Sequence, residues 1–160
     1  MTIVLVGPPG AGKTTVGRLL AARLGVPFRD TDADIETTAG KSIADIFYDD
    51  GEDQFRVLER AAVAAALAEH DGVLSLGGGA VLAEGTRGLL EGRHVVFLNV
   101  GLSDAAKRVG FNRDRPVLAL NPRAALQQLM AERLPLYRQV ATVEISTDGK
   151  SPEQVVSELA

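Results

Sequence analysis

The sequence contains no cysteine in its 160 residues. This absence excludes a disulfide framework, a thiolate zinc site and a cysteine nucleophile, and it favours the cytoplasm. A chain of this length can bury about two thirds of the surface that its unfolded form exposes. One domain can therefore be stable without a covalent or metal crosslink.

Positive charge is also scarce, since 17 Lys and Arg stand against 21 Asp and Glu, for a net charge of −4. The protein as a whole has no broad attraction for nucleic acid or anionic lipid. Its first residues, MTIVLVGPPG, include no basic segment, and their apolar run is too short for a membrane span or a signal peptide. We expect a cytoplasmic protein without a nucleic-acid or membrane partner, in which local basic residues would bind any anionic substrate.

Short apolar, β-branched runs alternate with helical patterns along the chain. The alternation predicts a single α/β domain over residues 1–160, with three α/β/α layers around a five-stranded, mostly parallel sheet. There is no internal repeat, low-complexity tract or linker. The predicted strands are Ile3–Val6, Val26–Phe28, Val73–Leu76, Val95–Leu98 and Val143–Ile145.

Helix signals lie between these runs. Lys13–Leu24 ends at Gly25 and places Val16, Leu19, Leu20 and Leu24 on one face. A second helix is expected over Glu52–Glu69. Further helix starts are indicated by a capping-box-like Ser42-Ile-Ala-Asp45, by Asn121-Pro122, and by a capping box at Ser151-Pro-Glu-Gln154.

The segment GPPGAGKT at residues 7–14 matches the P-loop pattern and follows a strand and opens a helix, as that motif requires. Backbone N–H groups and the helix N-terminus would bind phosphates, the lysine would reach the β- and γ-phosphates, and the threonine hydroxyl would bind Mg²⁺. The alternative is a glycine-rich turn with an incidental lysine. The predicted ATP contacts are Gly10, Ala11, Gly12, Lys13, Thr14 and Thr15.

Three aspartates, Asp30, Asp32 and Asp34, follow the second predicted strand. Ligands of open α/β sheets bind at the carboxyl ends of strands. Asp30 and Asp32 alternate along the chain, so we expect both to face the site, one supporting Mg²⁺ through water and one orienting or deprotonating a hydroxyl. The alternative role is capping of the next helix, which we assign to Asp34 or to the neighbours of Asp32.

Three successive glycines, Gly77 to Gly79, follow the strand Val73–Leu76. Glycine loses more conformational entropy on folding than other residues, so this run indicates a close approach of the backbone to a ligand. Neither Val73–Leu76 nor Val95–Leu98 ends in the aspartate that commonly supports the metal in P-loop proteins.

Seven short motifs follow one another along the chain in the order and spacing of a known protein family. The segments GPPGAGKTT, DTDADIE, GKSIADIF, FRVLE with Arg56, LGGGAV, NRDRPVL with Arg115, and ERLPLY with Arg133 occur in the order and spacing of the shikimate kinases. The chain resembles this family, which belongs to the nucleoside-monophosphate-kinase-like small-molecule kinases, over nearly all of its length. The family also takes its metal-supporting aspartate from the second strand.

The resemblance implies roles for individual residues. Asp32 would contact the ring hydroxyls and act as base or orienter, Asp30 would support Mg²⁺ through water, and Thr14 would ligate the metal directly. Arg56 and Arg133 would hold the shikimate carboxylate, for which planar guanidinium groups are suited. Gly77, Gly78 and Gly79 would offer backbone donors to substrate oxygens.

The family also has a lid, which corresponds here to residues 109–121 and carries Arg115 over the phosphates. Arg108 and Pro152 would lie on either side of adenine, and the acceptor-binding segment would span about residues 32–60. Without the family, Arg56 and Arg133 would be interpreted as solvated helix residues paired with neighbours such as Glu59 and Glu132.

The resemblance therefore implies a shikimate kinase of aromatic amino-acid biosynthesis, and we expect a monomer. It would use ATP and Mg²⁺ to phosphorylate the 3-hydroxyl of shikimate, with Asp32, Lys13 and Arg115 as its catalytic residues. One alternative is a related kinase for gluconate or a nucleoside monophosphate, with the same phosphate site and another acceptor pocket. The other is a non-catalytic module that responds to ATP.

Overall fold

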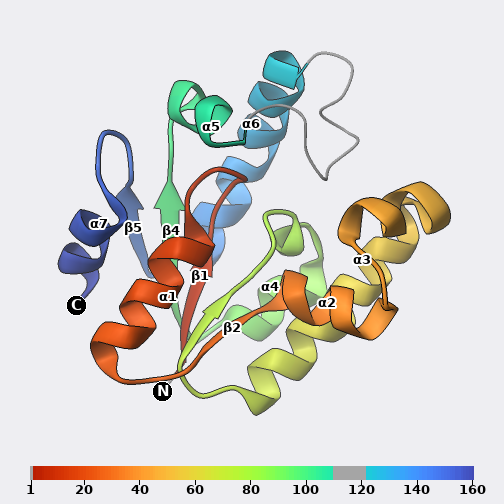
Figure 1. Cartoon of the computed structure of the whole chain (residues 1–160), viewed down its shortest axis with the longest axis horizontal. Coiled ribbons are helices and arrows are strands. Elements are labelled where there is room, and N and C mark those ends of the chain that lie inside the picture. Colours follow the sequence, from red (N-terminus) through yellow and green to blue (C-terminus); the bar gives the residue numbers. More distant parts are fainter. Residues whose placement is uncertain (1, 110–121) are drawn as a thin grey trace.

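The computed structural model describes residues 2–109 and 122–160 (Figure 1). Its sheet has the order β2-β3-β1-β4-β5, and all neighbouring strands in it are parallel. The predicted α/β class and five-stranded parallel sheet are thus confirmed. The strands are β1 (Ile3–Val6), β2 (Phe28–Asp30), β3 (Val73–Ser75), β4 (His94–Asn99) and β5 (Val143–Ser146).

The second strand begins two residues later than the predicted Val26–Phe28. The amide of Val26 donates to the Ala21 carbonyl at 3.0 Å, so Val26 still belongs to the turn that ends the first helix. Pro27 follows and has no N–H to give to a neighbouring strand. The strand can therefore begin only at Phe28.

Helices cover both faces of the sheet, which gives the predicted three layers (Figure 1). α1 and α7 pack together on one face, and α4, the second part of α3 and the second half of α6 cover the other. The helices are α1 (Lys13–Leu24), α2 (Thr31–Ala39), α3 (Ile43–Glu69), α4 (Glu84–Leu90), α5 (Leu102–Val109), α6 (Pro122–Val140) and α7 (Pro152–Leu159), with a 3₁₀ turn, η1, at Ala80–Leu82.

Successive residues of the central strands point to opposite layers. Leu5 of β1 packs with α1 and α7, whereas Val4 and Val6 pack toward α3, α4 and α6. Because both faces are covered, the central strands are apolar except at their ends and do not alternate with polar residues. This burial leaves only the strand ends for polar chemistry.

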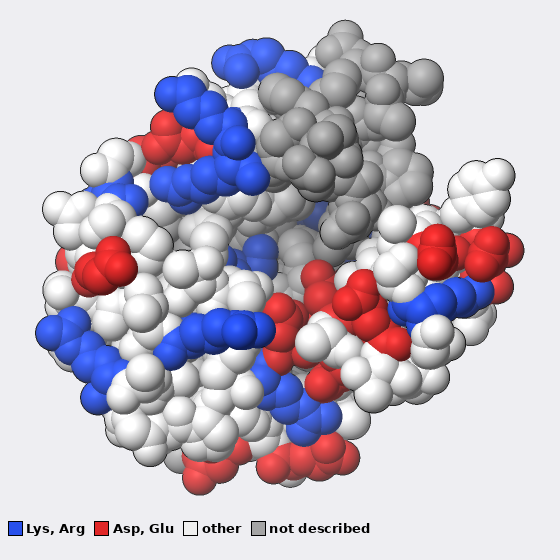
Figure 2. Space-filling view, in the orientation of Figure 1, with Lys and Arg blue, Asp and Glu red and all other residues white. Residues whose placement is uncertain are grey.

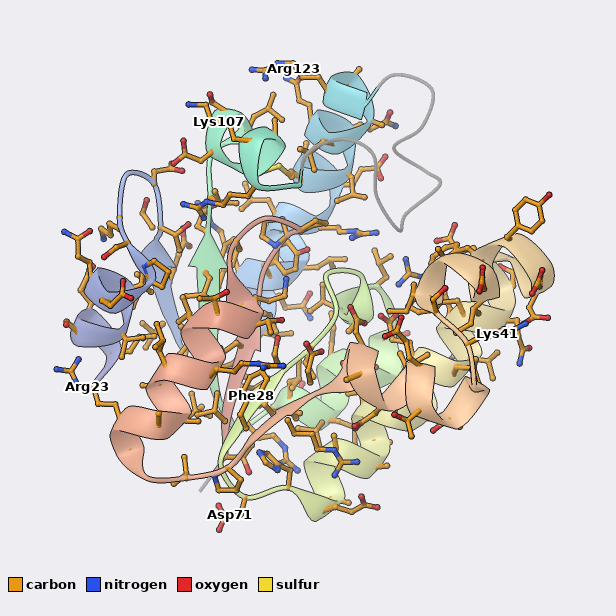
Figure 3. All side chains as sticks on the ribbon, viewed as in Figure 1. Arg23, Phe28, Lys41, Asp71, Lys107 and Arg123 are labelled. Carbon is orange, nitrogen blue, oxygen red and sulfur yellow. The ribbon has the colours of Figure 1, made fainter. Side chains whose placement is uncertain are left out.

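The first helix has the predicted bounds. Val16 and Leu20 are buried as expected, but Leu24 is 44% exposed because it lies at the end of the helix, next to the Gly25 turn. Phe28 lies beneath α1 (Figure 3), where a side chain at Gly17 would collide with its ring. This close packing holds β2 against α1 and thereby sets the spacing between the P-loop and the acidic segment.

Beside β2, α2 and the first part of α3 form an arm that stands off from the sheet (Figure 1). Ser42 caps α3 by accepting a hydrogen bond from the Asp45 amide, and the left-handed Gly51, with φ 85°, interrupts the helix. A new helical stretch then runs to Glu69, as predicted from Glu52 onward. A small core joins the arm to the second part of α3: Ile35, Ile43 and Ile46 come from the arm, and Phe55 lies beyond Gly51.

Candidate active site

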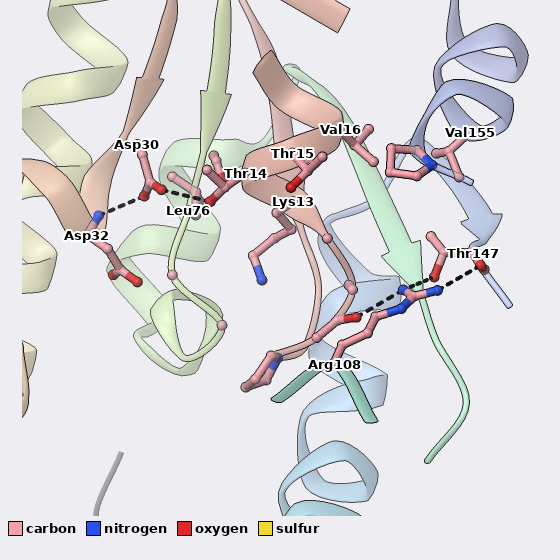
Figure 4. Close-up of a pocket in the computed structure, with 18 of the residues that line it drawn as sticks. Lys13, Thr14, Thr15, Val16, Asp30, Asp32, Leu76, Arg108, Thr147 and Val155 are labelled. Atoms are coloured by element: carbon pink, nitrogen blue, oxygen red, sulfur yellow. Dashed lines mark hydrogen bonds between the residues drawn. The ribbon is translucent and has the colours of Figure 1, made fainter. Parts of the chain in front are cut away.

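A cavity of about 490 Å³ opens above the P-loop at the carboxyl ends of the strands (Figure 4). Gly12 is the N-cap of α1, so the helix N-terminus faces this space. Lys13 Nζ donates to the carbonyls of Gly7 and Pro8 at 2.8 and 3.2 Å. Of the predicted ATP contacts, the cavity is lined by Gly10, Ala11, Gly12, Lys13, Thr14, Thr15, Arg108 and Pro152.

Asp30 is the last residue of β2 and the N-cap of α2. Its Oδ1 accepts from the Asp32 amide at 2.9 Å and its Oδ2 from the Thr14 hydroxyl at 3.0 Å (Figure 4). One of the three aspartates therefore does cap this helix, but the cap is Asp30, and the assignment to Asp34 is wrong. The predicted strand alternation of Asp30 and Asp32 is also wrong, because the chain turns into a helix at Thr31.

Both carboxylates nevertheless line the P-loop cavity. Burial raises the pKa of the Asp30 carboxyl, the negative charge of Asp32 raises this pKa further, and its hydrogen bonds and Lys13 lower it. Asp30 is thus held close to a second acid at some cost to the folded state. Such an arrangement suits a group that later receives a cation.

This pKa shift makes a prediction about stability. At pH values between the ordinary aspartate pKa of about 3.9 and the raised pKa, Asp30 binds its proton more in the folded protein than in the unfolded chain. Stability therefore falls as the pH rises through that window. Asp30→Asn keeps a good helix cap and removes the ionisation, so we expect it to be at least as stable as wild type at pH 7.

The measurement is urea unfolding of both proteins at pH 7 and pH 4, without nucleotide or divalent cation. The stability advantage of the variant at pH 7 should shrink at pH 4. An advantage that is independent of pH, or a variant less stable at both values, contradicts this assignment.

The oxygen atoms around Asp30 fit Mg²⁺. Within residues 2–109 and 122–160, no three Asp, Glu or His side chains are grouped to hold a metal by themselves. Mg²⁺ does not need such a cage, because it is usually bound by one or two protein oxygens together with waters and substrate phosphates. The Thr14 hydroxyl and the Asp30 carboxylate supply two such oxygens on the wall of the phosphate cavity.

Asp34, which had no predicted chemistry, forms an ion pair with Arg29 at 2.6 Å. Arg29 also contacts Glu69 at 3.1 Å, so it joins the start of α2 to the end of α3. The hydrogen bond that Arg29 Nε donates to the Asp34 carboxylate is the largest contribution to the raised pKa of Arg29. Asp34 thus has a structural contact, and it does not line the P-loop cavity.

The three glycines pack directly against the predicted site residues. A Cβ atom on Gly77 would lie 2.7 Å from Asp32 Oδ1, and one on Gly78 would lie 3.5 Å from Arg133 Nη1. A side chain on Gly79 would collide with the Arg56 guanidinium. The close approach of Asp32 and Arg56 therefore explains Gly77 and Gly79, whereas the tightest neighbour of a Cβ atom on Gly78 would be Pro9 Cδ at 3.2 Å.

A second cavity, of about 300 Å³, contains Arg56 and Arg133. Arg56 Nη1 bonds Glu59 Oε1 at 2.7 Å, and Glu59 is only 3% exposed. Arg133 is also buried, at 9% exposure, so the alternative of solvated helix residues is wrong for it. The other lining residues are Phe47, Glu52, Leu82, Ala125, Gln128, Leu129 and Glu132.

The two arginines therefore line a different cavity from Lys13 and Asp32. The glycine loop lies between the two cavities: Gly77 and Gly78 line the phosphate cavity, and Gly78 and Gly79 face the arginines. A molecule in the second cavity would have Asp32 and the glycine loop on its side toward the P-loop.

At the other end of the P-loop cavity, Arg108 links the P-loop to the segment between β5 and α7. Its Nη1 donates to the Gly10 carbonyl at 3.0 Å and to Thr147 Oγ1 at 3.1 Å. Pro152 lies on the same cavity wall, together with Thr147, Lys150 and Val155, which the sequence did not single out.

The predicted lid over residues 109–121 falls almost entirely on residues 110–121, which lie outside the described residues together with Arg115. Thr31 was not predicted, yet it is fully buried, and its hydroxyl accepts from the Gly77 amide at 3.3 Å. Its position between Asp30 and Asp32 is the feature of the sequence that could have indicated a place for Thr31 near the site.

Comparisons with known proteins identify the family of this chain. The family model described as shikimate kinase matches residues 9–160. The shikimate kinase of Saccharopolyspora erythraea is 63% identical over 157 residues, which cover 98% of this chain and 90% of that protein. The shikimate kinase of Salinispora arenicola is 61% identical over 157 residues, 98% of this chain and 94% of the other.

Among solved structures, the shikimate kinase from Acinetobacter baumannii in complex with shikimate superimposes with a TM-score of 0.95. It is 38% identical, and the match covers 99% of this chain and 89% of that one. The similarity therefore extends over the whole fold.

Proposed function

Because this chain belongs to the shikimate kinase family and is an ATP-dependent kinase, we propose that it phosphorylates the 3-hydroxyl of shikimate, giving shikimate 3-phosphate and ADP. The observation that carries this proposal is the placement of two cavities around one glycine loop. The P-loop cavity suits a triphosphate, and the neighbouring cavity contains two arginines suited to a carboxylate.

On the nucleotide side, the backbone N–H groups of Gly10, Ala11 and Gly12 and the N-terminus of α1 bind the phosphates, with Thr15 beside them. Lys13 leaves its carbonyl partners and contacts the β- and γ-phosphates, where it stabilises the transferring group. Arg108 and Pro152 flank the adenine. Their places on the wall of one cavity support this set.

On the acceptor side, Arg56 and Arg133 hold the carboxylate and thereby orient the ring. Gly77, Gly78 and Gly79 contact substrate oxygens, and Asp32 accepts the proton of the attacking hydroxyl or orients it. The hydroxyl oxygen forms a bond to the γ-phosphorus as the bond from that phosphorus to the ADP oxygen breaks. The hydroxyl proton passes to the Asp32 carboxylate or, if Asp32 only orients, to solvent.

Mg²⁺ would be held by the Thr14 hydroxyl and, through water, by Asp30. When bound, it neutralises phosphate charge during transfer. The hydrogen bond between Thr14 and Asp30 supports this pairing, since it brings two hard oxygen ligands together. For Arg115, the proposal that it covers the phosphates rests on the sequence motif alone.

We further propose that the enzyme acts as a monomer in the cytoplasm, without a nucleic-acid partner. All proposed site residues belong to one chain. The labelled cations Arg23, Lys41, Lys107 and Arg123 are spread around the periphery and form no single basic face (Figure 3). In the view of Figure 2, acidic side chains gather over the arm of α2 and α3, beside the central hollow, which disfavours a nucleic-acid surface there. No helix of the described residues is long and apolar enough to cross a membrane.

The test is ADP release measured separately with shikimate, gluconate and AMP as acceptors. We expect turnover that depends on shikimate, is abolished by EDTA and is restored by excess Mg²⁺. Equal or greater turnover with gluconate or AMP would refute the acceptor assignment. ATP binding without turnover on any of the three would favour the non-catalytic alternative.

A further inference from the structure

Tyr137 of α6 is a buried side chain to which the proposed function gives no role. It is 1% exposed, and its ring stacks on Phe97 with a centroid separation of 5.0 Å. Its hydroxyl donates to the carbonyl of Gly78 at 2.6 Å. A buried hydroxyl is costly unless it is hydrogen-bonded, and packing alone would be served equally well by phenylalanine. The phenol therefore points to a function of this contact.

The other backbone groups of the glycine loop show what the contact achieves. The Gly77 amide donates to Thr31, and the carbonyls of Gly77 and Gly79 accept from the amides of Ala80 and Leu82. Tyr137 binds the Gly78 carbonyl. Within the described residues, the N–H groups of Gly78 and Gly79 have no hydrogen-bond partner, although both residues are buried. Buried N–H groups of this kind are rare and are usually paired with a ligand or water.

The hydrogen bond of Tyr137 sets the direction of one of these two donors. The Gly78 carbonyl and the Gly79 N–H belong to the same peptide group, and none of the described peptide bonds is cis. In a trans peptide the C=O and N–H bonds point in opposite directions. Since the carbonyl points to Tyr137, the Gly79 N–H points away from α6, in a residue that lies against the Arg56 guanidinium.

Tyr137 also shares a helix with one of the acceptor arginines. Arg133 and Tyr137 are four residues apart on α6, so they lie on the same face of that helix. Both approach Gly78, Arg133 from the second cavity and Tyr137 from the buried core. One helix face thereby positions a charged side chain and a backbone donor relative to each other.

We propose that Tyr137 is a positioning residue for the acceptor: its hydroxyl fixes the Gly78–Gly79 peptide so that the Gly79 N–H is presented to an oxygen of the bound carboxylate or ring. The inference rests on the proposed function, since it assumes that the acceptor occupies the space beside Arg56 and Arg133. It adds a residue that does not touch the substrate and acts only through the loop.

The test is Tyr137→Phe, which removes the hydroxyl and keeps the ring stacked on Phe97. Tyr48→Phe is the matched control, since Tyr48 is the only other tyrosine and is 88% exposed. We expect the KM for shikimate to rise about 5- to 20-fold in Tyr137→Phe, in line with a lost, oriented hydrogen bond. The KM for ATP should stay within about twofold of wild type, and the control should match wild type in both constants.

The outcomes separate this inference from the proposed function. If wild type shows no turnover with shikimate, the proposed function fails. If wild type turns over shikimate and Tyr137→Phe keeps the wild-type KM for shikimate, only the positioning role fails. A variant with lower thermal stability and lower kcat but unchanged KM values would show a merely structural role and would also overturn the inference.

A second measurement does not depend on the folding of Tyr137→Phe. In Tyr48→Phe protein, Tyr137 is the only tyrosine, so incorporation of 3-fluorotyrosine gives one ¹⁹F resonance. We expect shikimate to shift this resonance in a saturable way, because the acceptor and the phenol bind the same peptide from opposite sides. A resonance unchanged at shikimate concentrations that saturate turnover would overturn the inference.

Discussion

Replacing Asp32 by asparagine is expected to lower kcat by about 10²- to 10⁴-fold, the usual contribution of a positioned general base. The variant keeps the shape of the side chain and loses its capacity to accept the hydroxyl proton. Asp32 lines the phosphate cavity and lies against Gly77, so it is placed between the two proposed substrates. Steady-state kinetics with shikimate and ATP varied in turn measure the effect, and the KM for ATP should change little.

Asp34→Asn is the matched control for this experiment. Asp34 lies two residues further along the same helix and pairs with Arg29, away from the cavity. Its loss should affect stability slightly and leave kcat close to wild type. Wild-type kcat in Asp32→Asn, or equal losses in both variants, would refute the assignment of Asp32 as base or orienter.

Arg133→Ala should act mainly on acceptor binding. Truncation of one partner of a buried, hydrogen-bonded charge pair costs about 2–5 kcal/mol, which is about 30- to 5,000-fold in affinity. Arg133 is almost fully buried, so little solvent is available to replace it beside a carboxylate. We expect the KM for shikimate to rise by a factor in this range, with the KM for ATP nearly unchanged.

Two further variants make the Arg133 experiment specific. Arg138→Ala removes an exposed arginine of the same helix, which pairs with Glu144, and should leave both KM values unchanged. Arg133→Lys keeps the charge and loses the planar fork, so it should recover only part of the affinity. A wild-type KM for shikimate in Arg133→Ala would remove this residue from the acceptor site.

Local patterns in the sequence were enough for much of the fold and for the phosphate site. The P-loop is a continuous stretch between a strand and a helix, so its residues reach the phosphate through local backbone geometry. The bounds of α1 and the capping box of α7 were likewise predictable, because the side chains and amides involved lie within one helical turn. The resemblance added Arg56 and Arg133, whose roles remain predictions.

Only the tertiary structure decided which residues from distant segments contact one another around the proposed acceptor site. The capping of α2 by Asp30, the burial of Arg133 and of Glu59 beside Arg56, and the contact of Tyr137 with Gly78 were missed or left open. Tyr137 and Gly78 are 59 positions apart along the chain. No short window of sequence contains such a pair, because burial and hydrogen-bond partners are set by the packing of α3 and α6 around the glycine loop.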